Sequence, residues 1–380
     1  MLQAAREFRI GPPQIYAGLM LLGFLAQALW AAGSRKLTDL EYQYIASGFS
    51  QPPGQDRGVE SPLTAWVASL PVRATRALRR IAPPAVSSAL AIPRPWLMRL
   101  PFVGFGVWLG GALWWVARRL FDDAGGYVAL GLYCTSPAMV MISSNIGPDI
   151  ILAWSIFGLV YTAIGVAHTL YAPPRKWIPR AVILGLALGF ALSTALWSFL
   201  LAVLAFAFMI YLAPGRRRSA FVVLLGASAV ALVVSGIFVR LTGGPGPGLR
   251  AMITPDPSLA LVRHLGFAIN GDTDGYVLVA LFIATLTAYG SWRRTRYFGN
   301  TAPLLTALAT VGLFALVPAI HVWDAALGLS FLFVFVGGVA ADWLETSFGK
   351  RVALLLTAGF LLRILLSTRA LWRWIGENSL

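Results

Sequence analysis

The sequence predicts an all-α protein that crosses a membrane many times. Of its 380 residues, 58% are hydrophobic and only 12% are charged, whereas soluble domains carry about 25% charged residues. The apolar residues stand in long continuous runs, many of them close to the ~20 residues that an α-helix needs to cross a bilayer. Apolar and polar positions do not alternate within these runs, so a transmembrane β-barrel is excluded.

Eleven apolar runs are candidate membrane-spanning helices, and they predict a single transmembrane domain over residues 1–380. The runs cover residues 15–33, 100–118, 124–143, 149–170, 181–195, 197–213, 219–241, 275–292, 302–320, 325–343 and 352–367. The apolar block at 181–213 is too long for one crossing, so we divide it near Ser198. The first run lacks a small-residue cleavage site, and we expect it to remain as a helix instead of being removed as a signal peptide.

Lysine and arginine recur in every second short loop, which predicts how the helices are oriented. A net charge of +15 would also suit a nucleic-acid-binding protein, but charge placed in short loops between spans is an orientation signal. We therefore expect no nucleic-acid partner, a cytoplasmic N-terminus and a place in the plasma (inner) membrane. The basic loops contain Arg6, Arg9, Arg118, Arg119, Arg175, Lys176, Arg180, Arg216, Arg217, Arg218, Arg293, Arg294, Arg296, Lys350 and Arg351.

With this orientation, most acidic residues lie on the outer face of the membrane. The two longest loops, residues 34–99 and 242–274, lie on the same side. The outer acidic residues are Asp39, Glu41, Asp56, Glu60, Asp149, Asp256, Asp272, Asp274 and Asp324. The polar chemistry of the protein is therefore expected at the outer face.

The first external loop is expected to contain a pair of amphipathic helices. Apolar residues recur at helical spacing at Leu63, Trp66, Val67 and Leu70, and arginines share one face further along. Pro71 is expected to separate the two helices. A helix with a basic face suits the lipid headgroup region, where arginine side chains reach the phosphates. Simple membrane anchoring is the alternative to any role of these arginines in a site.

The order of several short motifs resembles that of the membrane glycosyltransferases that use polyprenyl-phosphate sugars, the GT-C enzymes. The similarity is to the protein O-mannosyltransferases and to the bacterial aminoarabinose transferases that modify lipid A. It covers approximately residues 15–215. The motifs are Asp39-Leu40-Glu41, Ser61-Pro62-Leu63, Arg99-Leu100-Pro101 through Arg118-Arg119-Leu120-Phe121, and Ser136-Pro137 with Pro148-Asp149.

The resemblance implies transfer of a sugar from a polyprenyl-phosphate carrier to a hydroxyl or amine of a protein, lipid or glycan acceptor. A carboxylate at the exit of the first span would act as general base, which contributes roughly 10²–10⁴ in rate. Asp39 is the favoured base and Glu41 the alternative, because the family has two adjacent acids where this chain has Asp39-Leu40-Glu41. Asp149 is the third catalytic candidate, with capping of a helix N-terminus as the alternative.

Candidate substrate-binding residues lie in the outer loops and at the ends of the later spans. The departing phosphate needs cations, and the planar guanidinium of arginine suits it. The candidates are Arg57, Glu60, Arg263, His321 and Asp324, with Arg240 and Arg250 as alternative phosphate ligands.

Neither a cofactor nor a metal is predicted. The three histidines do not stand at metal-ligand spacing, which argues against zinc. A divalent cation held by Asp39, Glu41 and Asp149 is the alternative, since hard cations prefer carboxylates.

Two other functions stay open. A transporter or flippase for a lipid-linked sugar would often show internal repeats and charged residues within its spans. This chain shows no convincing repeat, and Arg363 is the exception among nearly uncharged spans. A non-catalytic relative that binds the carrier lipid is the other possibility. Some relatives have a lysine before the proline of the Pro-Leu motif, where this chain has Ser61.

Overall fold

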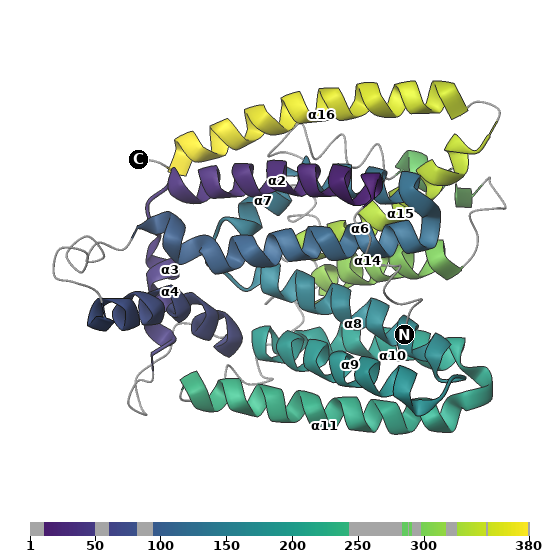
Figure 1. The fold of residues 1–380 in the computed structure, drawn as a ribbon, viewed down its shortest axis with the longest axis horizontal. Helices are drawn as coiled ribbons and strands as arrows, with labels where there is room; N and C mark the ends of the chain where they lie inside the picture. The colour runs from purple at the N-terminus through teal and green to yellow at the C-terminus, as the bar shows by residue number, and fades with distance from the viewer. Residues whose placement is uncertain are drawn as a thin grey trace.

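The computed structural model describes residues 11–49, 61–81, 94–242, 283–287, 289–290, 298–316, 325–346 and 349–378. Over these residues the chain forms a bundle of α-helices that lie roughly side by side, with the helices of residues 39–47 and 62–81 at one end (Figure 1). Seven of the described helices are long and apolar enough to cross a membrane. The chain is therefore a multi-pass membrane protein, as its composition predicts.

The described helices follow the predicted apolar runs, apart from the run at 275–292, which lies largely outside the described residues. The count of eleven spans therefore stays a prediction. The helices are α2 (Pro12–Gly33), α3 (Asp39–Ser47), α4 (Pro62–Ile81), α6 (Pro95–Cys134), α7 (Pro137–Ser143), α8 (Asp149–Thr169), α9 (Pro174–Thr194), α10 (Phe199–Leu212), α11 (Arg217–Thr242), α14 (Phe298–Leu316), α15 (Ala325–Leu344) and α16 (Gly349–Asn378). Proline stands at the start of α2, α6, α7 and α9, where its missing N–H breaks no helical hydrogen bond.

Helix α6 consists of two antiparallel arms that meet at Phe121 and Asp122. The backbone of both residues is non-helical, and Asp122 has a φ of 59°. The Tyr133 hydroxyl donates a hydrogen bond to the Gly106 carbonyl at 2.6 Å, which fixes the two arms side by side. This agrees with the predicted division into two runs, although the second arm ends at Cys134 and α7 follows as a separate short helix.

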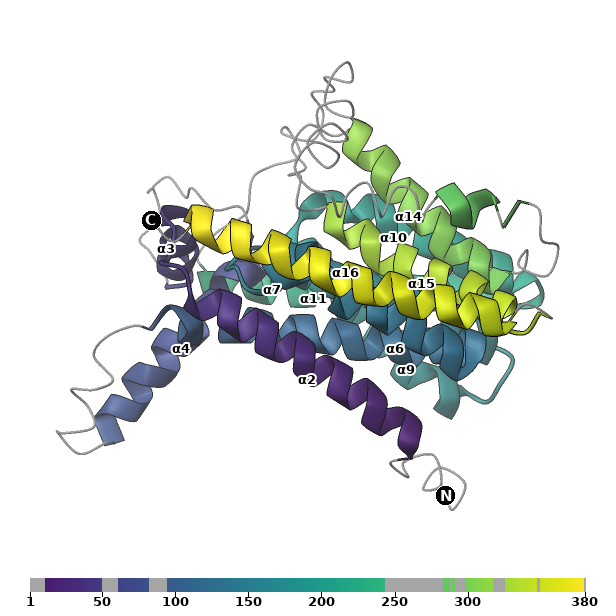
Figure 2. The same ribbon diagram turned by 90° about the horizontal axis from the view of Figure 1, so that it is seen from above.

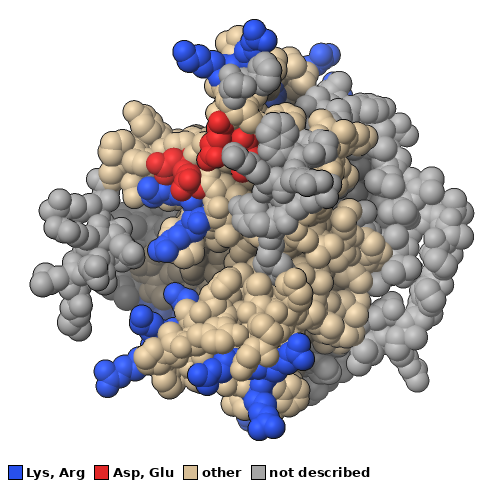
Figure 3. Space-filling model, turned by 90° about the vertical axis from the view of Figure 1, so that its right-hand side faces the viewer, with Lys and Arg blue, Asp and Glu red and all other residues tan. Residues whose placement is uncertain are grey.

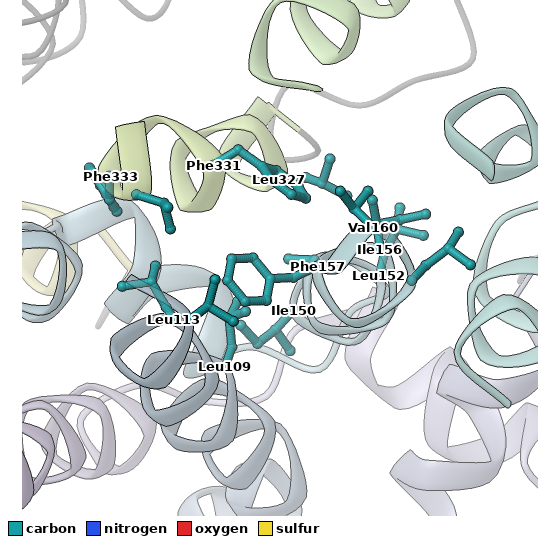
Figure 4. Close-up of a cluster of buried hydrophobic side chains, with 14 of the residues drawn as sticks. Leu109, Leu113, Ile150, Leu152, Ile156, Phe157, Val160, Leu327, Phe331 and Phe333 are labelled. Atoms are coloured by element: carbon teal, nitrogen blue, oxygen red, sulfur yellow. The ribbon is translucent and has the colours of Figure 1, made fainter. Parts of the chain in front are cut away.

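The core of the bundle lies between α6, α8 and α15 (Figure 4). Leu109 of α6, Phe157 of α8 and Phe331 of α15 are all fully buried, and the rings of Phe157 and Phe331 are 5.4 Å apart. Helix α8 is apolar on every side, which is the pattern of a buried helix. The first residue of this central helix is Asp149, so the core determines where its carboxylate lies.

The basic loops gather at one end of the bundle, and α3 and α4 lie at the other. Figure 3 looks onto the basic end, where many lysine and arginine side chains surround the ends of the helices. Arg118 and Arg119 come just before the break in α6, and Arg216 to Arg218 lie at the turn from α10 to α11. In Figure 1 this end is on the right, whereas α3, α4 and the end of α16 are on the left.

Helix α4 is one continuous helix, so the predicted pair of helices divided at Pro71 is wrong. Its first half packs against α3, α6, α9 and α11, and Leu63 and Val67 are buried within the protein. Because this packing holds the first half in place, the hydrogen bond lost at Pro71 does not divide the helix. The second half projects from the bundle (Figure 2) and carries exposed Arg73 and Arg76.

Candidate active site

The segment that follows α2 is held against the bundle by a fully buried arginine, Arg99 of α6. Its Nε donates to Glu41 Oε1 at 2.8 Å, and its Nη2 donates to Glu41 Oε2 at 2.6 Å and to the Lys36 carbonyl at 2.8 Å. Its Nη1 donates to the carbonyls of Ala32 at 2.7 Å and Arg35 at 2.9 Å. A guanidinium has five N–H donors, so Arg99 has none left for a substrate.

Glu41 is the partner of this arginine, and both of its carboxylate oxygens are engaged. Only 3% of the residue is exposed. Besides Arg99, it accepts hydrogen bonds from the backbone N–H groups of Thr38 at 2.9 Å and Ile146 at 3.0 Å. Burial alone would raise the pKa of Glu41, but the hydrogen bonds and charge of Arg99, with the two backbone donors, bring it below its ordinary value. The geometry therefore gives Glu41 a structural role.

The same carboxylate also starts α3, through a capping box. Thr38 Oγ1 accepts a hydrogen bond from the Glu41 N–H at 3.3 Å, while the Glu41 side chain accepts from the Thr38 N–H. The pattern Thr-x-x-Glu is the sequence signal for this motif, although we did not predict the cap from it. Asp39 consequently lies in the first turn of α3, where its side chain is exposed.

A second buried arginine, Arg35, was also missed from the sequence. Its Nη2 donates to the Ser144 carbonyl at 3.1 Å and to Asn145 Oδ1 at 2.5 Å. Its guanidinium lies 3.7 Å from the centre of the Trp374 ring, in α16. Burial, which is the largest cause, and the positive charge of Arg99 together lower the pKa of Arg35 to about 10, while the charge of Glu41 opposes the shift. No local sequence pattern marks these contacts.

These contacts bring the two predicted acidic sites to the same end of the molecule. Glu41 and Arg35 bind the turn between α7 and α8, and α8 begins three residues after Ile146, at Asp149. Asp149 is half-buried. Asp39 lies two residues before Glu41, so the network holds both Asp39 and Asp149 close to a shared set of hydrogen bonds.

The other predicted site residues stay predictions. Arg57, Glu60, Arg263, His321 and Asp324 lie outside the described residues. Arg240 is described, and its side chain is exposed in the last turn of α11. Within the described ranges, no group of three or more histidine, cysteine or acidic residues could hold a metal ion. The alternative of a divalent cation is therefore untested, and Glu41 could join such a site only by leaving Arg99.

Similarity to known proteins covers both the sequence and the fold. Residues 85–238 match the model of a family described as dolichyl-phosphate-mannose-protein mannosyltransferase. The resemblance to GT-C membrane glycosyltransferases is confirmed. The matched segment contains Arg99 and Asp149 but not Asp39 or Glu41. No match is found among curated proteins.

Two solved structures of ArnT from Cupriavidus metallidurans have a fold similar to that of this chain. The apo structure aligns with a TM-score of 0.65 at 14% identity, over 96% of this chain and 76% of ArnT. The structure bound to undecaprenyl phosphate aligns with a TM-score of 0.66 at the same identity and coverage. At 14% identity, the similarity to ArnT establishes the fold of this chain and not its activity.

Proposed function

We propose that this protein transfers a sugar from a polyprenyl-phosphate carrier to a hydroxyl or amine of a protein, lipid or glycan acceptor. The observation that carries the proposal is the network around Glu41, which holds Asp39 and Asp149 at one end of a GT-C fold. The match over residues 85–238 to a mannosyltransferase family supports the same reaction class. ArnT, which shares the fold, has been solved with undecaprenyl phosphate bound.

In the proposed mechanism Asp39 is the general base. Its exposed carboxylate takes the proton of the acceptor hydroxyl or amine while the acceptor atom forms a bond to the anomeric carbon. The bond between that carbon and the phosphate oxygen breaks, and its electron pair leaves with the phosphate. Attack from the face opposite the phosphate inverts the anomeric centre. Asp149 would bind and orient the acceptor.

The leaving phosphate would be stabilised by arginines of the outer loops. Arg57 and Arg263 remain the proposed ligands, and Arg240 is the alternative with an exposed side chain. Arg99 is unsuitable, because its five donors are already bound within the protein. Arginine suits this role, since its planar fork matches the oxygens of a phosphate.

We further propose that the site faces outward from the plasma (inner) membrane. The support is the position of the short basic loops, which lie at the end of the bundle opposite α3 and α4 (Figures 1 and 3). Short basic loops stay in the cytoplasm by the positive-inside rule. The donor lipid would therefore be used on the periplasmic face.

The replacement Asp39→Asn tests the proposed base. We expect a loss of roughly 10²–10⁴ in transfer rate with normal expression and folding, because the side chain is exposed. Mass spectrometry of surface lipids and glycans, from cells with wild-type, variant or no protein, measures the product. Asp123→Asn at the basic end is the matched control and should leave transfer intact. Full transfer by the Asp39→Asn protein would overturn the mechanism.

A non-catalytic role in binding the carrier lipid is the second candidate function. It is favoured by the geometry of Glu41, which is fully engaged and leaves a single available acid in the first turn of α3. This role predicts binding of undecaprenyl phosphate to the purified protein without any glycosyl product. Product formed by the wild type and lost in Asp39→Asn would exclude it.

A further inference from the structure

The C-terminal helix α16 meets the candidate site through two tryptophans. Trp374 lies against the guanidinium of Arg35, with 3.7 Å between the guanidinium carbon and the ring centre. Trp372, two residues earlier, packs instead on Trp30 of α2, with ring centres 4.8 Å apart. The two rings differ in exposure: 61% of Trp372 is exposed, whereas Trp374 is partly buried against the core. Only Trp374 therefore contacts the charged network.

Arg35 is placed where its charge is disfavoured. Only 4% of the residue is exposed, and a second cation, Arg99, lies close enough to lower its pKa. Within the described residues, the ion pairs are Arg99 with Glu41 and Arg118 with Asp123, and neither includes Arg35. The contacts that hold the guanidinium inside are thus the ring of Trp374, the Ser144 carbonyl and the Asn145 amide oxygen. A cation over the face of an indole is among the stronger contacts of this kind.

We propose that Arg35 is a positioning residue, held by Trp374, through which the C-terminal helix fixes the turn before Asp149. As far as sugar transfer is concerned, this inference rests on the proposed function. The chain of contacts runs from Trp374 to Arg35, and from Arg35 to Ser144 and Asn145. The next residue, Ile146, donates to Glu41, and α8 with Asp149 begins three residues later. Asp149 is thereby held relative to α3 from two directions.

The contribution of Arg35 to the position of Asp149 can be separated experimentally from that of Glu41. Without the ring of Trp374, one face of the guanidinium is open to water, and Arg35 gains by moving outward because its buried charge has lost one of its three contacts. Its hydrogen bonds to Ser144 and Asn145 are then lost. The bonds between Arg99 and Glu41 do not involve Trp374 and stay in place. The turn before Asp149 should loosen while α3 remains capped.

Hydrogen exchange of the full-length protein in nanodiscs tests the inference without any substrate. The variants are Trp374→Leu, Trp374→Phe, Arg35→Met and the double variant Trp374→Leu/Arg35→Met. We expect amide exchange in residues 143–149 to rise about tenfold in both leucine and methionine single variants. The double variant should rise no further, because both changes break the same contact. Trp374→Phe should restore slow exchange, since its ring offers a face to the cation.

Trp372→Leu is the matched control, because this ring also lies at the end of α16 but does not contact Arg35. Exchange at residues 143–149 should stay at the wild-type rate in this variant. In transfer assays, Trp374→Leu should lower kcat about 10- to 100-fold, because small misplacement of reacting groups is costly, with KM much less changed. Trp372→Leu should keep the wild-type kcat.

Unchanged exchange in Trp374→Leu, an equal effect in Trp372→Leu, or additive effects in the double variant would overturn the inference. The inference would also be overturned if amide exchange in Trp374→Leu rises as expected while its kcat stays at the wild-type value. If exchange behaves as expected but the wild type itself forms no glycosyl product, the positioning role is supported and the proposed function fails. The two claims are thus tested separately.

Discussion

At the scale of single residues, two acids that stand two positions apart have different surroundings. Glu41 is buried, hydrogen-bonded to Arg99 and part of the cap of α3, whereas Asp39 is exposed in the first turn of the same helix. A base must be able to take a proton and release it, and a carboxylate with both oxygens bound inside the protein is poorly suited to this. This contrast is why we assign the proposed base to Asp39.

The replacement Glu41→Gln tests the structural role that we assign to Glu41. It leaves the buried guanidinium of Arg99 without its counter-charge, and breaking a buried pair in this way costs about 3–5 kcal/mol. The purified protein should therefore unfold at a clearly lower temperature than the wild type at neutral pH. Asp39→Asn leaves the network intact and should unfold close to the wild type.

The difference in Tm between the wild type and Glu41→Gln should depend on pH, because the pKa of Glu41 is lowered in the folded protein. The ordinary value is 4.5, and the folded-state value lies below it. The stability that Glu41 contributes is therefore complete above about pH 4.5 and is lost as the pH falls through the folded-state pKa. The difference in Tm between wild type and Glu41→Gln should shrink below pH 4.5. A difference that stays constant well below that pH would contradict the proposed network.

At the scale of helices, the position of Asp39 depends on close packing of α3 on α4. Gly48 ends α3, and a Cβ at this position would lie 2.1 Å from the Ala65 carbonyl oxygen and 2.6 Å from the Ser69 side chain. The Gly48 carbonyl also accepts a hydrogen bond from Arg73 at 2.6 Å. The absence of a side chain therefore lets the two helices touch, and α4 in turn packs on α6, α9 and α11 of the bundle.

The replacement Gly48→Ala should force α3 away from α4, because the obstructing atom belongs to the backbone and cannot simply rotate aside. Overpacking of this kind typically costs about 1–3 kcal/mol, so the Tm should fall, and transfer should fall with the displacement of Asp39. The control is Gly18→Ala in α2, where no atom lies within 4 Å of the added Cβ. A Gly48→Ala protein as stable and active as the control would show that the close contact is unimportant.

At the scale of the whole molecule, the sequence predicts the spans far better than it predicts the site. A membrane span is a local property, so an apolar run of sufficient length is enough to locate α2, α8 or α15. The network is not local: Arg99 and Glu41 are 58 residues apart in sequence, and Arg35 and Ser144 are 109 apart. No periodicity reveals which buried arginine pairs with which acid.

The same reasoning explains the mistaken reading of α4 and the missed capping box. The apolar positions of the first half of α4 fit a membrane surface and a protein interior equally well, and only the fold shows that they pack inside the bundle. Thr38-x-x-Glu41 is a local signal and was available in the sequence. It predicts the start of α3 and a structural role for Glu41, whereas the family resemblance predicts Glu41 as a possible general base.

The proposed mechanism requires that the end carrying α3 faces outward, and cysteine labelling of intact spheroplasts tests this orientation directly. The only native cysteine, Cys134, is replaced by alanine, and Gln43→Cys in α3 or Lys176→Cys at the start of α9 is added; both positions are exposed. A membrane-impermeant maleimide should label the Gln43→Cys protein in intact spheroplasts, and the Lys176→Cys protein only after the membrane is opened. Labelling of the Gln43→Cys protein only after the membrane is opened would place the candidate site in the cytoplasm and contradict the proposed mechanism.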